Sequence, residues 1–295
     1  MTRYKAIFTP AKLQERTLAF KEYWEHLLAH NGAIQEDRQS FERKSDYYRS
    51  LQGRPVRARA RFASAQTFAE ITQGFTDQDL HHTDRRLLAL ATIYRFANHE
   101  AGGVRAAWAS TPGFTECATL REKITRYHLC EEFCHLRLFA EMFKVFSLSA
   151  EWRPLPWSTR VAYAAIVRLP GWLLSPGAFC SEMMGIVFYR HIRRVLQDLF
   201  AGEPEVLDRL LELLGEIMVD ELGHIGERRS YLGDTGIRLS RQILPMMIRR
   251  FFDDIPEAKV ILDIDRMVQD ALDFDYSGID TAITKRAWIP AYCHA

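Results

Sequence analysis

EEFCH at residues 131–135 and DELGH at residues 220–224 share one pattern, acid–Glu–x–x–His. Positions three apart lie on one face of an α-helix, so the second acid and the histidine of each segment point the same way. Both segments lie in apolar stretches, where a carboxylate is strongly unfavourable unless it is paired or binds a metal. The pattern predicts two helices that present carboxylates and imidazoles to one buried site.

Two other apolar stretches each present a single glutamate on their apolar stripe. Glu100 is the only acid between Asp84 and Glu116, and Glu182 lies among methionine, isoleucine and tyrosine residues. A lone acid on an apolar face requires a partner. A salt bridge would satisfy each glutamate, and so would a metal ion shared with the two pentapeptides.

Helical periodicity dominates the chain and strand-like alternation is scarce, which predicts an all-α fold. We expect Thr83 to cap one helix, and Ser175 followed by Pro176 to begin another. The polar, arginine-rich residues 37–63 are expected to form a surface connection with a solvated face. The expected helices cover residues 10–30, 83–108, 119–146, 159–168, 175–200, 204–231, 240–252 and 257–272.

The spacing of the acids predicts two helical hairpins joined by a long connection. Glu100 and Glu132 are 32 residues apart, Glu182 and Glu221 are 39 apart, and Glu132 and Glu182 are 50 apart. Two helices that each supply a Glu, and two that each supply Glu-x-x-His, form di-iron or di-manganese sites in four-helix bundles. Such an oxygen-rich set favours iron or manganese over structural zinc. The expected metal ligands are Glu100, Glu132, His135, Glu182, Glu221 and His224.

The acid that precedes each ligand glutamate has a role of its own in this interpretation. A metal-bound histidine usually donates its other ring N–H to a carboxylate, a backbone carbonyl or water, which fixes the ring. We therefore expect Asp220 to orient His135, and Glu131 to orient His224, across the bundle.

On these motifs the chain resembles the ferritin-like di-iron carboxylate oxygenase superfamily over roughly residues 83–232. The resemblance implies a ferritin-like four-helix bundle with additional N- and C-terminal helices, in one domain spanning residues 1–295. The acid before each ligand glutamate is similar to that of bacterial multicomponent monooxygenases and acyl-carrier desaturases. The resemblance also implies two iron ions as cofactor, with manganese or an iron–manganese pair as alternatives, and O2 as co-substrate.

A looser resemblance, through length and the segment DFDY at residues 273–276, connects the chain to p-aminobenzoate N-oxygenases. Those enzymes carry an extra histidine four residues before the last ligand glutamate, where this chain has Ile217. Here His128 stands four residues before Glu132 instead, either as a seventh ligand or as a hydrogen-bonded core histidine. Many ribonucleotide reductase small subunits place a radical tyrosine where this chain has Phe139.

Four residues are candidates for a substrate pocket beside the metals: Gly103, Phe139, Gly185 and Tyr189. Glycine inside a helix costs about 1 kcal/mol relative to alanine. Gly103 and Gly185 therefore indicate either room for dioxygen and substrate or close helix packing. Phe139 and Tyr189 are explained at least as well as ordinary core residues.

The resemblance implies a non-haem di-iron oxygenase that hydroxylates or N-oxygenates a small apolar or aromatic substrate, free or presented by a carrier protein. An acyl desaturase and a ferritin-like iron-storage or peroxide-scavenging protein are the alternatives, together with a metal-free helical binding module. Electrons must come from an external ferredoxin or reductase, because the chain has no Gly-rich nucleotide-binding motif. Oxygenases of this kind commonly form homodimers.

Composition bears on partners and location. The formal net charge of +1 offers no electrostatic argument for a nucleic-acid partner. Five cysteines without a paired framework indicate a reducing, cytoplasmic compartment. The longest uncharged run in the most apolar region, residues 169–181, is shorter than the roughly 20 apolar residues that cross a bilayer. We expect no transmembrane segment, and contact with a membrane surface or a lipid carrier stays open.

Overall fold

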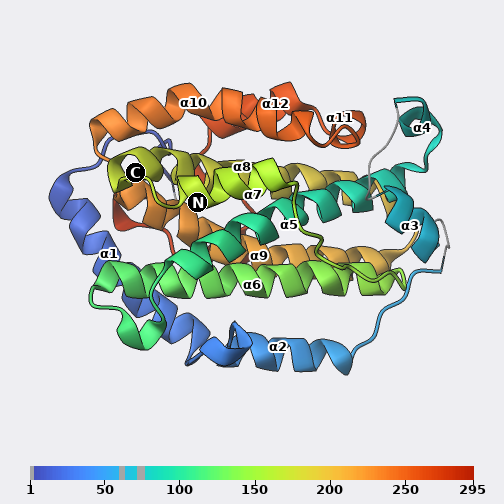
Figure 1. The fold of residues 1–295 in the computed structure, drawn as a ribbon, viewed down its shortest axis with the longest axis horizontal. Coiled ribbons are helices and arrows are strands. Elements are labelled where there is room, and N and C mark those ends of the chain that lie inside the picture. The colour runs from blue at the N-terminus through green and yellow to red at the C-terminus, as the bar shows by residue number, and fades with distance from the viewer. Residues whose placement is uncertain (1–2, 60–63, 72–76) are drawn as a thin grey trace.

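Helices form nearly all of the computed structural model, which describes residues 3–59, 64–71 and 77–295 (Figure 1). The one sheet in these residues is a two-residue antiparallel hairpin of β1 (Ile34–Gln35) and β2 (Ser40–Phe41). The all-α fold class predicted from the periodicity is therefore confirmed. None of the described helices combines the length and the apolar character needed to cross a membrane.

Four long helices form the centre of the molecule (Figure 1). They are α5 (Arg85–Ser110), α6 (Leu120–Val145), α8 (Gly171–Leu199) and α9 (Pro204–Ser230). Helix α5 packs on α6, α6 on α9, α9 on α8 and α8 on α5, so the contacts close a ring. Their inward faces bury most of the apolar core. This burial, rather than helix propensity, supplies most of the stability of such helices.

The remaining elements surround these four helices. Helix α1 (Leu13–Asn31) packs on α9 and α6, α7 (Trp157–Ile166) packs on α5, and α10 (Asp234–Asp253) packs on α8 and α12 (Ile264–Leu272). The shorter elements are η1 (Glu36–Arg38), α2 (Glu42–Gln52), α3 (Ala65–Ile71), α4 (Asp77–His82), η2 (Phe114–Glu116), α11 (Ala258–Ile261), η3 (Tyr276–Gly278), α13 (Thr281–Thr284) and η4 (Ala291–Cys293).

Two predicted helix starts are wrong. Asp84, not Thr83, caps α5, because its carboxylate accepts the backbone N–H of Arg86 at 2.9 Å. Helix α8 begins at Gly171, so Pro176 lies inside the helix rather than at its first position. A proline at this position removes the backbone hydrogen bond to the Trp172 carbonyl and crowds that carbonyl, and the Ser175 hydroxyl donates to the Gly171 carbonyl at 2.6 Å in the same turn.

The basic connection at residues 37–63 is only partly a solvated surface. Arg54, Arg57 and Arg59 are exposed, whereas the side chain of Lys44 on α2 is completely buried. Residues 60–63 lie outside the described part of the chain. The prediction failed at Lys44 because its partners are carboxylates far away in the sequence.

The helix predicted at residues 257–272 is divided in two. Leu262 has an extended backbone (φ −118°, ψ 141°), which ends α11 after Ile261. The Asp263 side chain then caps α12 by accepting the backbone N–H of Arg266 at 2.9 Å. A new cap within the segment explains the break.

Gly226 is where the C-terminal segment packs against α9. A Cβ at this position would lie 2.6 Å from Pro290 Cδ and 2.7 Å from Trp288 Cζ3, both closer than carbon atoms approach. Gly226→Ala is therefore expected to destabilise the protein by about 1–3 kcal/mol through overpacking. Urea unfolding measures this, and Gly215→Ala on the same helix is the control, since its Cβ meets only Arg193 Nη1 at 3.9 Å. Equal stability of the two variants would contradict close packing at Gly226.

Candidate metal centre

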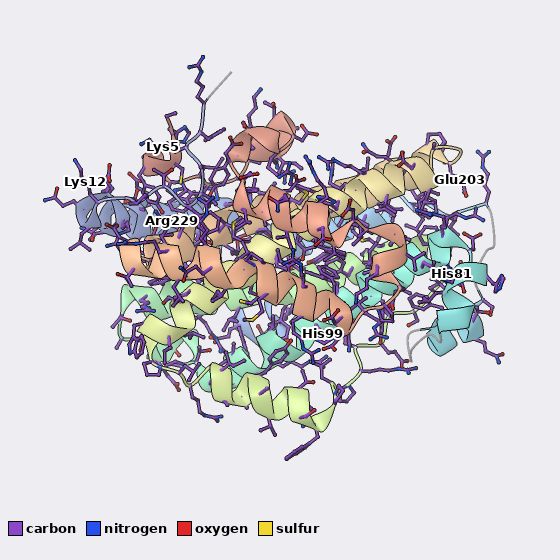
Figure 2. All side chains as sticks on the ribbon, turned by 90° about the horizontal axis from the view of Figure 1, so that it is seen from above. Lys5, Lys12, His81, His99, Glu203 and Arg229 are labelled. Atoms are coloured by element: carbon purple, nitrogen blue, oxygen red, sulfur yellow. The ribbon has the colours of Figure 1, made fainter. Side chains whose placement is uncertain are left out.

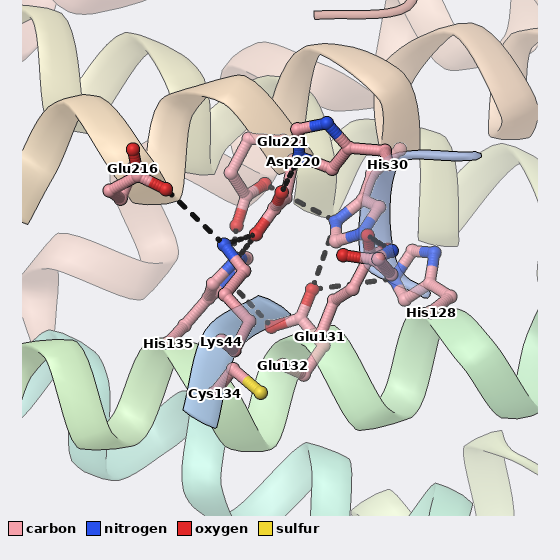
Figure 3. Close-up of polar contacts among 12 residues, drawn as sticks. His30, Lys44, His128, Glu131, Glu132, Cys134, His135, Glu216, Asp220 and Glu221 are labelled. Carbon is pink, nitrogen blue, oxygen red and sulfur yellow. Dashed lines mark hydrogen bonds and ion pairs between the residues drawn. The ribbon is translucent and has the colours of Figure 1, made fainter. Parts of the chain in front are cut away.

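Six of the seven residues that the sequence singled out as ligands come together between α6, α8 and α9. Figure 3 labels four of them, His128, Glu132, His135 and Glu221. They form two groups, and within each group one potential ligand atom per residue lies within 4.8 Å of all the others. The side chains of His135 and His224 are completely buried. The two groups consist of His128, Glu132, Glu182 and His224, and of Glu132, His135 and Glu221.

Glu132 belongs to both groups, with a different oxygen in each. Its Oε1 lies 3.1 Å from His224 Nδ1 and 3.3 Å from His128 Nε2. Its Oε2 lies 3.6 Å from His135 Nδ1, and Glu221 Oε1 lies 3.3 Å from the same nitrogen. A carboxylate placed in this way can bridge two neighbouring cations.

Glu100, the remaining predicted ligand, lies in neither group. Its Oε1 accepts the hydroxyl of Tyr189 at 2.6 Å, and its Oε2 is buried without a hydrogen-bond partner among the described residues. Burial, together with the charges of Glu132 and Glu221, raises the pKa of the Glu100 carboxyl well above its usual value. Glu100 is therefore close enough to the cluster to sense its charge but is bonded to Tyr189.

Asp220 and Glu131 hold the outer nitrogens of the two histidines. His135 Nε2 lies 3.0 Å from Asp220 Oδ2, and His224 Nε2 lies 2.9 Å from Glu131 Oε2. These are the two acid–histidine pairs that were predicted from the sequence. Each contact turns the other ring nitrogen, Nδ1, toward the carboxylates of the cluster.

The surroundings of the two histidine Nδ1 atoms indicate whether these residues could bind a metal. The Nδ1 atoms of His135 and His224 are buried, and although carboxylate oxygens lie 3.3 Å and 3.1 Å from them, neither forms a hydrogen bond of acceptable geometry among the described residues. Buried polar atoms without a partner are rare and need an explanation. Imidazole nitrogens aimed at several carboxylate oxygens are a donor set that suits iron or manganese. The buried His and Glu groups could therefore hold metal ions, and the residues fit them.

The cluster shifts the pKa values of its own members strongly. Burial by itself would raise the pKa of the Glu132 carboxyl, but the charge of His135 and the neighbouring imidazoles hold it well below its usual value. Burial would lower the pKa of His135 and His224, yet the adjacent acids raise both well above the usual value. Burial and the charge of Glu132 raise the pKa of Glu221 to about 7. A cation bound here would displace the protons that these groups hold.

Three residues near the N-terminus complete the surroundings of the site, and sequence reasoning missed their role. Lys44 Nζ lies 2.5 Å from Asp220 Oδ2, and His30 Nε2 lies 3.6 Å from Asp220 Oδ1. Asn31 donates its amide to Glu131 Oε1 at 2.6 Å. No local pattern marks these three residues as part of a site.

Arg228 was also missed, although a signal for it exists in the sequence. It follows His224 by four residues and so lies on the same face of α9. Its Nε is 3.4 Å from Glu182 Oε1, and its Nη2 is 3.5 Å from the ring nitrogens of His128. Arg228 therefore neutralises part of the acidic charge on the His128 side.

The four candidate pocket residues differ in how close they lie to the acidic cluster. A Cβ at Gly185 would lie 3.6 Å from Glu221 Oε2, so this glycine faces the cluster. A Cβ at Gly103 would instead meet Tyr163 of α7 at 3.9 Å. Phe139 and Tyr189 are fully buried in the core with their ring centroids 6.2 Å apart. Gly185 and Tyr189 are thus the two candidates that border the acidic cluster.

His128 stacks on His224, with ring centroids 3.6 Å apart, and its Nε2 lies 3.4 Å from Glu182 Oε1. This position suits a metal ligand beside Glu182 and His224, so we expect His128→Ala to change the visible absorption of the Co2+-loaded protein. His191→Ala is the control, because His191 is a buried histidine on α8 that pairs with Asp270 instead. Identical spectra for wild type and His128→Ala would make His128 a core histidine.

Comparison of the chain with protein-family models, curated proteins and solved structures gave no match. The function must therefore be argued from the site itself.

Proposed function

We propose that this protein is a non-haem di-iron oxygenase with a ferritin-like four-helix bundle made by α5, α6, α8 and α9. It would hydroxylate or N-oxygenate a small apolar or aromatic substrate. The observation that carries the proposal is the placement of Glu132, whose two oxygens face two different groups of ligand atoms. A dinuclear site is well served by a carboxylate that faces both ion positions, whereas a single buried ion pair gives no reason for this placement.

The residues available to each ion follow from the two groups. One ion would be held by His224, Glu182 and Glu132, with His128 as a further ligand. The other would be held by His135, Glu221 and Glu132. Glu100 lies near the group of Glu132, His135 and Glu221 and would be a further oxygen ligand available to the ion held there. When bound, the two irons would supply the O2 binding and the electron transfer that amino-acid side chains lack.

The chain's own contribution is orientation, exclusion of water and control of protons. Asp220 and Glu131 fix the two imidazole rings, so little reorganisation accompanies metal binding. The ligand histidines are fully buried, which keeps bulk water from the reacting centre. The Tyr189 hydroxyl donates to Glu100 and can pass a proton to or from that carboxylate at the edge of the cluster.

Metal analysis with optical spectroscopy tests the proposal. Purified protein is loaded with ferrous iron without oxygen, analysed for bound metal and then exposed to O2. About two irons per chain and a transient visible absorption are expected. Protein that binds no iron, manganese or mixed pair, or that shows no response to O2, would overturn the proposal.

Substrate dependence separates the oxygenase from a ferritin-like storage or scavenging protein. O2 consumption with a reductase or ferredoxin as electron donor is measured while apolar and aromatic compounds are added, free or carrier-bound. An oxygenase consumes O2 in proportion to a compound that it oxidises. Iron oxidation that continues for many irons per chain, and that no compound stimulates, would identify storage instead.

A further inference from the structure

Residues 157–173 form the most exposed apolar segment in the described part of the chain. The side chain of Trp157 is 76% exposed and that of Trp172 is 74% exposed. Six of the twelve exposed large hydrophobic residues lie in these seventeen positions, and no residue of α7 is fully buried. We call the six residues the tryptophan face: Trp157, Val161, Ile166, Leu169, Trp172 and Leu173.

Exposure on this scale is informative because soluble proteins rarely leave large apolar patches uncovered unless the patches bind something. Trp157 and Val161 are one helical turn apart, so they project from the same side of α7. In Figure 2, α7 lies in yellow-green at the edge of the molecule, outside the helix that carries His99. The tryptophan face is therefore available to a partner.

The charged residues within the segment that carries the tryptophan face are of one sign. Between Glu151 and Glu182 the chain has no acidic residue, while it has three arginines, Arg153, Arg160 and Arg168. All three are exposed. Among the described residues, neither Arg160 nor Arg168 forms an ion pair with an acid. A partner for this surface must combine an apolar region with negative charge.

A lipid bilayer with anionic headgroups has this combination. Tryptophan is enriched at the level of the headgroups, where its ring is apolar and its N–H meets polar groups. An amphipathic helix can lie in the interface with its apolar face in the lipid and its arginines on the phosphates. We propose that the tryptophan face docks this protein on the surface of anionic membranes.

Self-association through the same face is disfavoured by charge. In a two-fold symmetric interface the patch meets its own copy, so Arg160 and Arg168 would approach the same residues of the second chain. With no acid in the segment to compensate them, these charges repel each other. The anionic headgroups of a bilayer can pair with the arginines, whereas the same segment of a second copy has no acid to pair with them.

The helix α7, which carries part of the tryptophan face, packs on α5 near Glu100. Tyr163 of α7 places its hydroxyl 3.4 Å from His99 Nδ1, next to Glu100 on α5. Leu155 packs so closely on Gly102 that a Cβ there would clash with its Cδ1. If the oxygenase proposal holds, docking would turn the α7 side of α5 toward the lipid. That orientation would suit an apolar substrate dissolved in the membrane. Membrane binding itself does not depend on that proposal.

Vesicle sedimentation tests the docking with the full-length protein, with or without metal. Vesicles of phosphatidylcholine alone are compared with vesicles that contain phosphatidylglycerol, at low and high salt. We expect binding to the anionic vesicles, weakened by salt, with a blue shift of tryptophan fluorescence. Trp157→Ser/Trp172→Ser and Arg160→Glu/Arg168→Glu are each expected to weaken it at least tenfold.

The control changes equally exposed apolar residues elsewhere. Leu13 is 68% exposed and Met246 is 65% exposed, both outside the tryptophan face, so Leu13→Ser/Met246→Ser should bind as wild type does. Circular dichroism and thermal unfolding establish that all variants fold. The docking proposal would be overturned if the wild-type protein did not bind anionic vesicles, or if the tryptophan variants bound them as well as the control does. A dimer that only the tryptophan variants disrupt would also overturn it, because the face would then be a protein interface. Loss of iron binding would affect only the oxygenase proposal.

Discussion

Glu132→Ala is expected to abolish the binding of two metal ions. Glu132 is the only residue that belongs to both groups of ligand atoms, so its loss removes one oxygen from each ion position. It also removes a negative charge that lies within 3.6 Å of a ring nitrogen of His128, His135 and His224. Metal analysis after loading with ferrous iron is expected to fall from about two irons per chain to fewer than one.

The matched control for this variant is Glu141→Ala. Glu141 lies on the same helix, but it pairs with Lys144 at the surface and touches neither group. Its metal content should equal that of wild type. If Glu132→Ala retained two irons per chain while remaining folded, Glu132 would not bridge the ions and the dinuclear assignment would be wrong.

Asp220→Asn is expected to weaken both the fold and the metal site. Asp220 is fully buried and holds Lys44 at 2.5 Å and His135 at 3.0 Å. Removing its charge leaves the buried ammonium of Lys44 with Glu216 at 3.8 Å as its remaining acidic partner. Breaking a buried ion pair on one side costs about 3–5 kcal/mol. Loss of the carboxylate behind a ligand histidine typically weakens metal affinity about 10–100-fold.

Urea unfolding of the metal-free protein and a metal-binding titration measure the two effects separately. Asp208→Asn is the control, because Asp208 lies on the same helix but is exposed to solvent. It should change neither quantity. Wild-type stability of Asp220→Asn would show that the Lys44–Asp220 pair does not stabilise the fold. Wild-type metal affinity would show that Asp220 does not orient a ligand.

Much of the site was predictable because its members are close in sequence on regular helices. Glu132 and His135, and likewise Glu221 and His224, share a helix face because three residues make almost one turn. Any folded state that keeps these helices keeps each pair together. The apolar periodicity that marks the helices also buries them, so the inward direction of the acids was predictable too.

The limits of sequence reasoning are equally specific. Lys44 was placed on a solvated face because its neighbours in the chain are polar, whereas it is fully buried against Asp220, 176 positions away. Glu100 was grouped with the other ligands, but the hydroxyl of Tyr189, 89 positions away, holds it outside both groups. Contacts between residues so distant in the chain depend on how the helices pack.

The sequence by itself therefore determined the all-α class, the approximate positions of the long helices and the two Glu-x-x-His faces, because these depend on interactions within a few residues. Only the tertiary structure decided that Glu132 is shared between two groups and that Lys44 and Asn31 support the outer acids. It also decided that the apolar segment at residues 157–173 remains on the surface. The physical reason is that hydrophobicity favours burial of any apolar segment, and only the packing of the whole chain selects which segments are covered.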